Sequence, residues 1–160
     1  MEIGKNGPVL FWIEDRPLTV TPQESILKQA EIPFHMYGTP SELTSVLNDL
    51  LTGMDVNKLR IGFIIDIMLF GVSDLRSLDI WDAPTGNGVH AGYVFVDRFL
   101  RTKNSRFINK PVCFLTERTL DDDLMQDINK LQTRSGGNIE IIQKYKDAEL
   151  PRFQKFLKNI

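Results

Sequence analysis

The chain has 160 residues, of which 42% are hydrophobic and 25% are charged, and its formal net charge at pH 7 is −2. We expect a single domain over residues 1–160, because this length suffices to bury one core. The near balance of charge gives no sign of the basic surface on which nucleic-acid binding usually depends. No apolar run approaches the roughly 20 residues of a membrane span. Neither nucleic acid nor a membrane is therefore expected as a direct partner.

Two features predict a cytoplasmic protein. The first residues, MEIGKNG, contain no long apolar stretch of the kind that directs secretion. Cys113 is the one cysteine of the chain, which excludes an intramolecular disulfide and is typical of a reducing compartment. Because Cys113 lies within an apolar run, we expect it to be an inert thiol in the core.

Short, continuous apolar runs recur along the chain, and segments with helical patterns separate them. Such runs are typical of strands buried on both faces, and they occupy residues 8–13, 33–37, 59–65, 111–116 and 138–142. Helices between such strands cover both faces of a parallel sheet. The sequence therefore predicts an α/β fold, a doubly wound five-stranded parallel sheet in three layers.

Capping signals mark the expected starts of the helices. The sequences TPQE and TPSE each place a threonine, a proline and a glutamate as a capping box requires, so Thr21 and Thr39 are predicted N-caps. The acidic run at 121–123 suits the first turn of a further helix, because carboxylates there complement the helix dipole. Pro151 is expected in the first turn of the last helix.

The segment 67–88 stands out because it is long and carries several turn signals. It separates the third predicted strand from a helix-like segment at 89–101. Loops longer than about 12–15 residues are uncommon and often functional, so we interpret 67–88 as an insertion that forms a lid or a partner surface. Its TGNG sequence lacks the lysine and hydroxyl of a phosphate-binding P-loop and is predicted to be a turn.

Polar residues follow the predicted strands directly. They are Glu14 and Asp15 after the first strand, Asp66 after the third, Thr116 after the fourth and Lys144 after the fifth. Ligands bind at the carboxyl ends of the strands in an open α/β sheet, so we expect these side chains to converge on one edge. Three neighbouring carboxylates repel one another by about 1 kcal/mol per pair in water. A hard cation such as Mg²⁺, which prefers oxygen ligands, removes that repulsion.

Lys144 and the hydroxyl of Thr116 are then placed to bind the oxygens of a phosphoryl group. An aspartate nucleophile, a metal, a lysine and a hydroxyl donor together describe phosphoryl transfer to a carboxylate. Plainer explanations stay open at this point. They are Asp66 as a helix cap or a solvated carboxylate, the acidic pair as bonded to Arg16, Thr116 as the cap of its strand, and Lys146 in place of Lys144.

In order and position, these residues resemble the receiver domain of two-component response regulators. The similarity rests on IEDRP, IIDIMLFG, FLTE and IIQKY, and it extends over essentially the whole chain. The resemblance implies a flavodoxin-like (receiver) architecture with Asp66 as the phosphoacceptor. It further implies that Mg²⁺ is held by Glu14, Asp15, Asp66 and the carbonyl of Met68, that Thr116 is a switch hydroxyl, and that Lys144 contacts the phosphoryl group.

The resemblance also implies a function. A stand-alone receiver is a phosphoprotein that accepts a phosphoryl group from a histidine kinase or a phosphotransfer protein. No output domain follows the fifth strand unit, so we expect it to signal through a protein partner. Its enzymatic activity is expected to be at most self-phosphorylation from a donor and slow autodephosphorylation. Receivers often pair through the last sheet edge and its flanking helices, so a homodimer is a further expectation.

Three residues depart from the family's usual pattern. Tyr145 stands where a proline in a cis peptide usually follows the lysine, Glu117 where a small residue usually follows the threonine, and Ile141 where an aromatic switch residue is common. These differences favour the alternative of a receiver-like interaction module that is not phosphorylated. A Mg²⁺-dependent phosphohydrolase is a third hypothesis, but Met68 stands where it needs a second aspartate.

Overall fold

Five parallel strands form one sheet in the order β2-β1-β3-β4-β5. The computed structural model describes residues 6–72, 74–81, 83–136 and 138–160. The strands are β1 (Val9–Ile13), β2 (Phe34–Tyr37), β3 (Ile61–Asp66), β4 (Val112–Thr116) and β5 (Ile139–Gln143). This arrangement confirms the predicted fold class, and each strand lies within two residues of its predicted limits.

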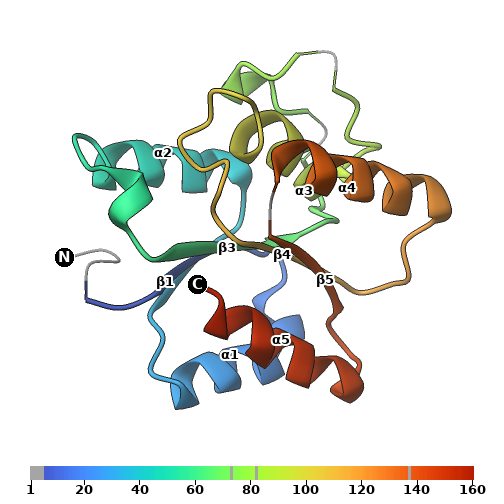
Figure 1. The fold of residues 1–160 in the computed structure, drawn as a ribbon. Coiled ribbons are helices and arrows are strands. Elements are labelled where there is room, and N and C mark those ends of the chain that lie inside the picture. The colour runs from blue at the N-terminus through green and yellow to red at the C-terminus, as the bar shows by residue number, and fades with distance from the viewer. Residues whose placement is uncertain (1–5, 73, 82, 137) are drawn as a thin grey trace.

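Helices cover both faces of the sheet (Figure 1). They are α1 (Thr21–Gln29), α2 (Pro40–Leu50), α3 (Ala91–Phe95), α4 (Asp122–Ser135) and α5 (Leu150–Lys158). Helices α1 and α5 lie on one face, and α2, α3 and α4 lie on the other (Figure 1). The helix α3 continues directly into a π-helical turn, Val96–Leu100, so the predicted helix at 89–101 is present in this composite form.

Alternate residues of each strand face the two helical layers, as the pleat of a strand requires. In β1, Leu10 and Trp12 pack into the cluster beneath α1 and α5, whereas Phe11 and Ile13 pack into the cluster on the opposite face. All four side chains are fully buried. Cys113 is buried in the same way, which confirms its predicted place in the core, and burial raises the pKa of its thiol.

Of the two predicted threonine N-caps, one is confirmed and the other is wrong. Thr39 is the N-cap of α2, and its side chain accepts a hydrogen bond from the backbone N–H of Glu42, as predicted. The prediction for Thr21 is wrong, because Val20 is the N-cap of α1 and Thr21 is already the first helical residue. The 3-10 turn Pro17–Val20 runs directly into α1, so the helix begins without the extended residue that a side-chain cap needs.

The other two predictions about helix ends are confirmed. Asp122 and Asp123 lie in the first turn of α4, and Asp121 is its N-cap, which accepts a hydrogen bond from the N–H of Leu124. Pro151 lies in the first turn of α5. Among the described residues, no helix is both long and apolar enough to cross a membrane.

The segment that follows β3 packs back on the end of that strand. The N–H of Leu69 donates to the carbonyl of Gly88 over 2.9 Å, and the N–H of Gly92 donates to the carbonyl of Ile67 over 2.9 Å. TGNG forms the expected turn, in which the N–H groups of Gly88 and His90 both donate to the carbonyl of Thr85. The segment therefore packs against the carboxyl end of β3.

Gly92 permits this close packing of α3 against β3. A Cβ atom at this position would lie 1.9 Å from the backbone oxygen of Asp66 and 2.8 Å from the Cα of Ile67. Because both are backbone atoms, no side-chain rotation relieves the overlap. The first turn of α3 therefore fixes the end of β3, where Asp66 lies.

We predict that Gly92→Ala destabilises the protein by about 2–3 kcal/mol, because the new methyl group forces α3 away from the end of β3. Urea unfolding monitored by tryptophan fluorescence measures the change. Gly7→Ala is the matched control, since a Cβ at Gly7 meets nothing within 4 Å. Equal stability of the two variants would contradict the proposed contact.

Candidate functional site

The predicted polar residues lie at the carboxyl ends of the strands, where the strand order reverses between β1 and β3. Ile13 of β1 is in register with Ile65 of β3, so the residues that follow them reach the same level. Glu14 and Asp15 follow β1, and Asp66 is the last residue of β3. This switch point is where open α/β sheets bind their ligands.

Three carboxylates meet at this point. One oxygen from each of Glu14, Asp15 and Asp66 lies within 4.8 Å of the other two. Glu14 and Asp66 are almost completely buried, at 2% and 1% exposed. Their convergence confirms the geometry expected from the sequence and explains why Asp66 ends a continuous apolar strand.

Lys144 supplies the positive charge of the site. Its Nζ lies 2.7 Å from Oε2 of Glu14 and 2.7 Å from Oδ2 of Asp66. The lysine is 2% exposed, whereas Lys146 is exposed to solvent. The structure therefore selects Lys144 over its sequence neighbour.

The backbone of Lys144 is held from two directions. Its N–H donates to the carbonyl of Thr116 over 2.9 Å, and its carbonyl accepts from Nε2 of Gln23 over 3.0 Å. Gln23 is a fully buried residue of α1. The sequence gives little sign of this role for Gln23, because a polar residue on the inner face of an amphipathic helix is its only signal.

Burial and the crowding of charges change the acid–base behaviour of the site. Burial and, secondarily, the charge of Glu14 raise the pKa of Asp66 to about 7, although Lys144 opposes the shift. Burial disfavours the charged form of Lys144, but Asp66 and Glu14 outweigh it and raise its pKa. The two buried carboxylates thus share one ammonium group, and the site retains an excess of negative charge.

This donor set fits a hard divalent cation. Oδ2 of Asp15 accepts a hydrogen bond from the N–H of Phe70 over 2.8 Å. Oδ1 of Asp15 is buried and has no hydrogen-bond partner among the described residues. A buried carboxylate oxygen without a donor is costly unless a cation binds it. Carboxylate oxygens are the ligands that Mg²⁺ prefers, so Glu14, Asp15 and Asp66 are suitable ligands.

Two predicted site residues make local contacts. The hydroxyl of Thr116 donates to the carbonyl of Arg118 over 2.9 Å, so it stabilises its own loop here. The N–H of Met68 donates to Oδ1 of Asp66 over 3.2 Å, which places the Met68 backbone beside the carboxylate. Binding of a metal by the Met68 carbonyl and a switch role for Thr116 stay predictions.

A contact that the sequence did not reveal lies over the site. Arg16 forms an ion pair with Glu117, and its guanidinium carbon lies 4.6 Å from the centre of the Phe70 ring. Oε1 of Glu117 is also 4.0 Å from Nζ of Lys144. We call these three residues, Arg16, Glu117 and Phe70, the clasp. It joins the loops that follow β1, β3 and β4.

The alternative interpretation, in which Glu14 and Asp15 are bonded to Arg16, is correct only in part, because Glu14 bonds to the backbone N–H of Arg16 and not to its side chain. The N–H of Arg16 donates to Oε1 of Glu14 over 2.9 Å, while the Arg16 side chain pairs with Glu117. The only signal in the sequence was a glutamate where small residues are usual. Because Glu117 lies 101 positions from Arg16 in the chain, only the folded structure identifies it as the partner of Arg16.

Comparison with known proteins places this fold among receiver domains. No protein-family model matches the chain, and no curated protein matches it. A putative response regulator from Chloroflexus aurantiacus J-10-fl is similar in structure, with a TM-score of 0.57 and 16% identity over 94% of this chain and 97% of that one.

Two further solved structures show the same similarity. The BeF3-activated N-terminal receiver domain of Klebsiella pneumoniae RstA has a TM-score of 0.56 and 17% identity, covering 95% of this chain and 99% of that one. A response regulator from Thermotoga maritima has a TM-score of 0.57 and 16% identity, covering 94% and 98%. The chain therefore has the flavodoxin-like fold of response-regulator receiver domains.

We predict that Asp66→Asn stabilises the metal-free protein at alkaline pH by about 1 kcal/mol or more, because it removes a buried charge beside Glu14. The folded-state pKa of Asp66 is raised to about 7 from an ordinary 3.8. The stability that protonated Asp66 provides is complete below its unfolded pKa and is lost as pH rises through the folded pKa.

The advantage of the Asn variant should consequently grow between about pH 4 and pH 7, the unfolded and folded pKa values of Asp66. Urea unfolding in the presence of a chelator measures it. Asp49→Asn, at an exposed position of α2, is the control and should show no such pH dependence. A variant less stable than the parent at every pH would show that the Lys144 contact outweighs burial.

Proposed function

We propose that this protein is a response-regulator receiver that accepts a phosphoryl group on Asp66 in a Mg²⁺-dependent reaction. The observation that carries the proposal is the position of Asp66. It is a buried strand-end carboxylate, 2.7 Å from Lys144 and within 4.8 Å of the two acidic residues that follow β1. The resemblance in sequence and the receiver fold support the same conclusion.

In the proposed reaction, an oxygen of Asp66 attacks the phosphorus of the donor. The new P–O bond forms as the bond to the leaving group breaks, and the leaving group departs with that electron pair. When bound by Glu14, Asp15 and Asp66, with the Met68 carbonyl as a further ligand, Mg²⁺ offsets the negative charge of the phosphoryl oxygens.

Lys144 has a second role in this reaction. Its ammonium group now contacts both Glu14 and Asp66, and an ammonium has three hydrogens to donate. One of these can bind a phosphoryl oxygen while another keeps the contact with Glu14. Gln23 and the carbonyl of Thr116 hold the backbone of Lys144, so the ammonium group is positioned before the donor arrives.

Exposed apolar residues around the site support a protein as donor. Leu18, Phe70 and Tyr145 are 93%, 54% and 62% exposed, and they lie in the segments that follow β1, β3 and β5. Exposed apolar side chains that gather around a site are typical of a docking surface. We therefore propose a histidine kinase or phosphotransfer protein as the phosphodonor and a further protein as the output partner.

The clasp favours a second candidate function, a receiver-like module that acts without phosphorylation. Glu117 carries a negative charge beside Lys144, and an anionic phosphodonor must approach past it. In that case, binding to a partner would be unaffected by Asp66→Asn. Direct detection of the acyl phosphate separates the two functions.

We predict that incubation with Mg²⁺ and acetyl phosphate adds a single phosphoryl group, because the small donor needs no protein docking surface. Intact-mass spectrometry detects the adduct, which should be absent from Asp66→Ala and from samples with excess chelator. Asp49→Ala is the matched control. An adduct that persists in Asp66→Ala would falsify the assignment of the acceptor.

If no adduct forms, titration with beryllofluoride followed by the fluorescence of buried Trp12 provides a second measurement. A silent titration would favour the module that acts without phosphorylation. A fluorescence change that requires Asp66 would instead show that the site binds a phosphoryl mimic.

We predict that Glu117→Ala raises the rate of phosphorylation by acetyl phosphate by roughly threefold to tenfold. It removes a negative charge 4.0 Å from Lys144 and releases Arg16, so repulsion of an anionic donor falls. Glu140→Ala removes a glutamate–arginine ion pair away from the site, with Arg152, and should leave the rate unchanged. An unaltered rate in Glu117→Ala would show that the clasp does not limit access.

A further inference from the structure

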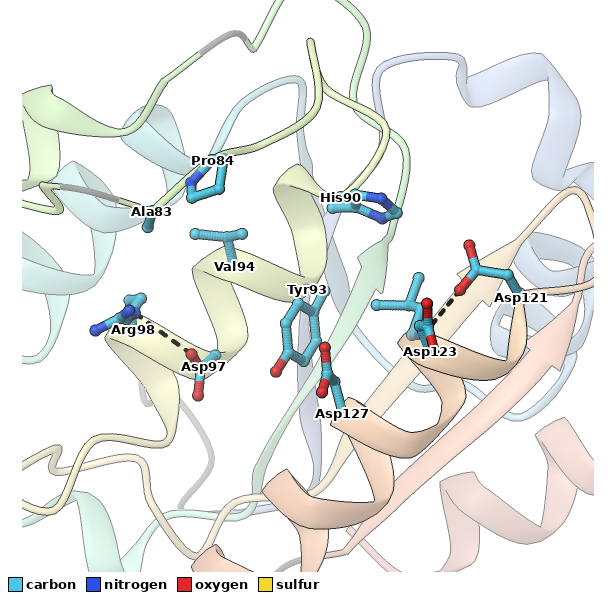
Figure 2. Close-up of a pocket in the computed structure, with 11 residues that line it drawn as sticks. Ala83, Pro84, His90, Tyr93, Val94, Asp97, Arg98, Asp121, Asp123 and Asp127 are labelled. Carbon is cyan, nitrogen blue, oxygen red and sulfur yellow. Dashed lines mark hydrogen bonds and ion pairs between the residues drawn. The ribbon is translucent and has the colours of Figure 1, made fainter.

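A pocket of about 370 Å³ lies between α3 and α4, beside the turn at the end of the 67–88 segment (Figure 2). Its apolar lining consists of Ala83, Pro84, Tyr93, Val94 and Leu124. Three separate segments thus build one depression, on a part of the surface that the phosphorylation chemistry does not use.

Acidic side chains line the same pocket. Asp97, Asp121, Asp123 and Asp127 lie around it, together with Arg98 and His90. Burial and then the charges of Asp97 and Asp127 raise the pKa of the Tyr93 hydroxyl, as expected of an electronegative environment. Figure 2 shows Tyr93 in the middle of the pocket, with Asp97 on one side and Asp127 on the other.

Two of the four carboxylates are already used. Asp97 is paired with Arg98 and with Arg134, and Asp121 caps α4. The other two remain available to a ligand. Among the residues that the structure describes, Asp127 has only the exposed Lys130 as an ion-pair partner, at 3.6 Å, and Asp123 has none. A cation that enters the pocket therefore meets two carboxylates on one wall.

The side of the pocket opposite α4 has an uncommon backbone conformation. Asp97 and Arg98 belong to the π-helical turn that continues α3. Such turns are rare, and they occur frequently at functional sites. Here the turn supplies the charged end of the pocket, whereas the α-helical residues Tyr93 and Val94 supply its apolar part.

The pocket continues toward the phosphorylation site. A second depression, also of about 370 Å³, is lined by Met68 and Thr116 at one end and shares His90, Asp121 and Leu124 with the first. Nδ1 of His90 is buried and has no hydrogen-bond partner among the described residues. Two adjoining depressions that share a wall exceed the size of a single side chain and fit an extended segment.

We propose that the pocket between α3 and α4 binds a peptide segment of a protein partner that inserts a lysine or arginine side chain next to an apolar one. The apolar lining receives the aliphatic stem of the basic residue. Asp123 and Asp127 bind its charged end through charge-assisted hydrogen bonds. The proposal does not depend on the phosphorylation of Asp66.

The test uses a minimal probe, acetyl-Leu-Arg-amide, titrated into ¹⁵N-labelled full-length protein without Mg²⁺ or phosphodonor. The matched probe is acetyl-Leu-citrulline-amide, which has the same shape and no charge. We expect the amide signals of Ala83, Tyr93, Val94 and Leu124 to shift with the arginine probe. The citrulline probe and the variants Asp123→Asn and Asp127→Asn should each bind about fivefold more weakly.

Asp122→Asn is the matched control. Asp122 lies in the same helical turn and carries the same charge, but it lines a different depression, beside Gln143, so its replacement should leave the affinity unchanged. Asp122, Asp123 and Asp127 are all exposed, and the dispersion of the amide spectrum verifies that each variant is folded. No shift at these amides, equal shifts with both probes, or an equal loss in Asp122→Asn overturns the proposal.

Discussion

The ammonium group of Lys144 lies between the carboxylates of Glu14 and Asp66, 2.7 Å from each, and the site depends on this contact. Removing the lysine would leave the two buried carboxylates without compensation, which is strongly destabilising. The contact joins β5 to β1 and β3, while the backbone of Lys144 is bonded to Thr116 at the end of β4 and to Gln23 of α1. One residue thus connects four strands and a helix. A lysine held in this way can compensate an added phosphoryl group without first becoming ordered.

Without a metal, the negative charges of the site outnumber its positive charge. Two buried carboxylates and the half-buried Asp15 face a single lysine, and Oδ1 of Asp15 has no donor among the described residues. The site is therefore suited to bind a cation. The protein folds although these buried carboxylates lower its stability locally. Gly92 contributes by allowing α3 to pack against the backbone of Asp66, so that the charged end of β3 is held by backbone contacts in addition to ionic ones.

Two surfaces of different character flank this centre. The clasp covers the proposed phosphorylation site with a partly buried ion pair and an aromatic ring, and ion pairs that remain in contact with solvent contribute little to stability. It can therefore open at small cost. The pocket between α3 and α4 combines an apolar lining with carboxylates and takes no part in the proposed chemistry. We thus infer that the clasp controls access to Asp66, whereas the residues of the pocket between α3 and α4 bind the basic segment.

The sequence by itself determined the sheet, the order of its elements and the residues at the strand ends, because buried parallel strands leave continuous apolar runs whose last positions are visible. It also determined the Thr39 cap, since capping is local, but it misplaced the Thr21 cap, where a preceding 3-10 turn decides. Only the tertiary structure showed that Lys144 contacts Glu14, that Arg16 pairs with Glu117, and that Asp127 shares a pocket with Tyr93. Each of these contacts joins side chains that are distant in sequence, and pattern and propensity, which act over a few residues, do not specify such pairs.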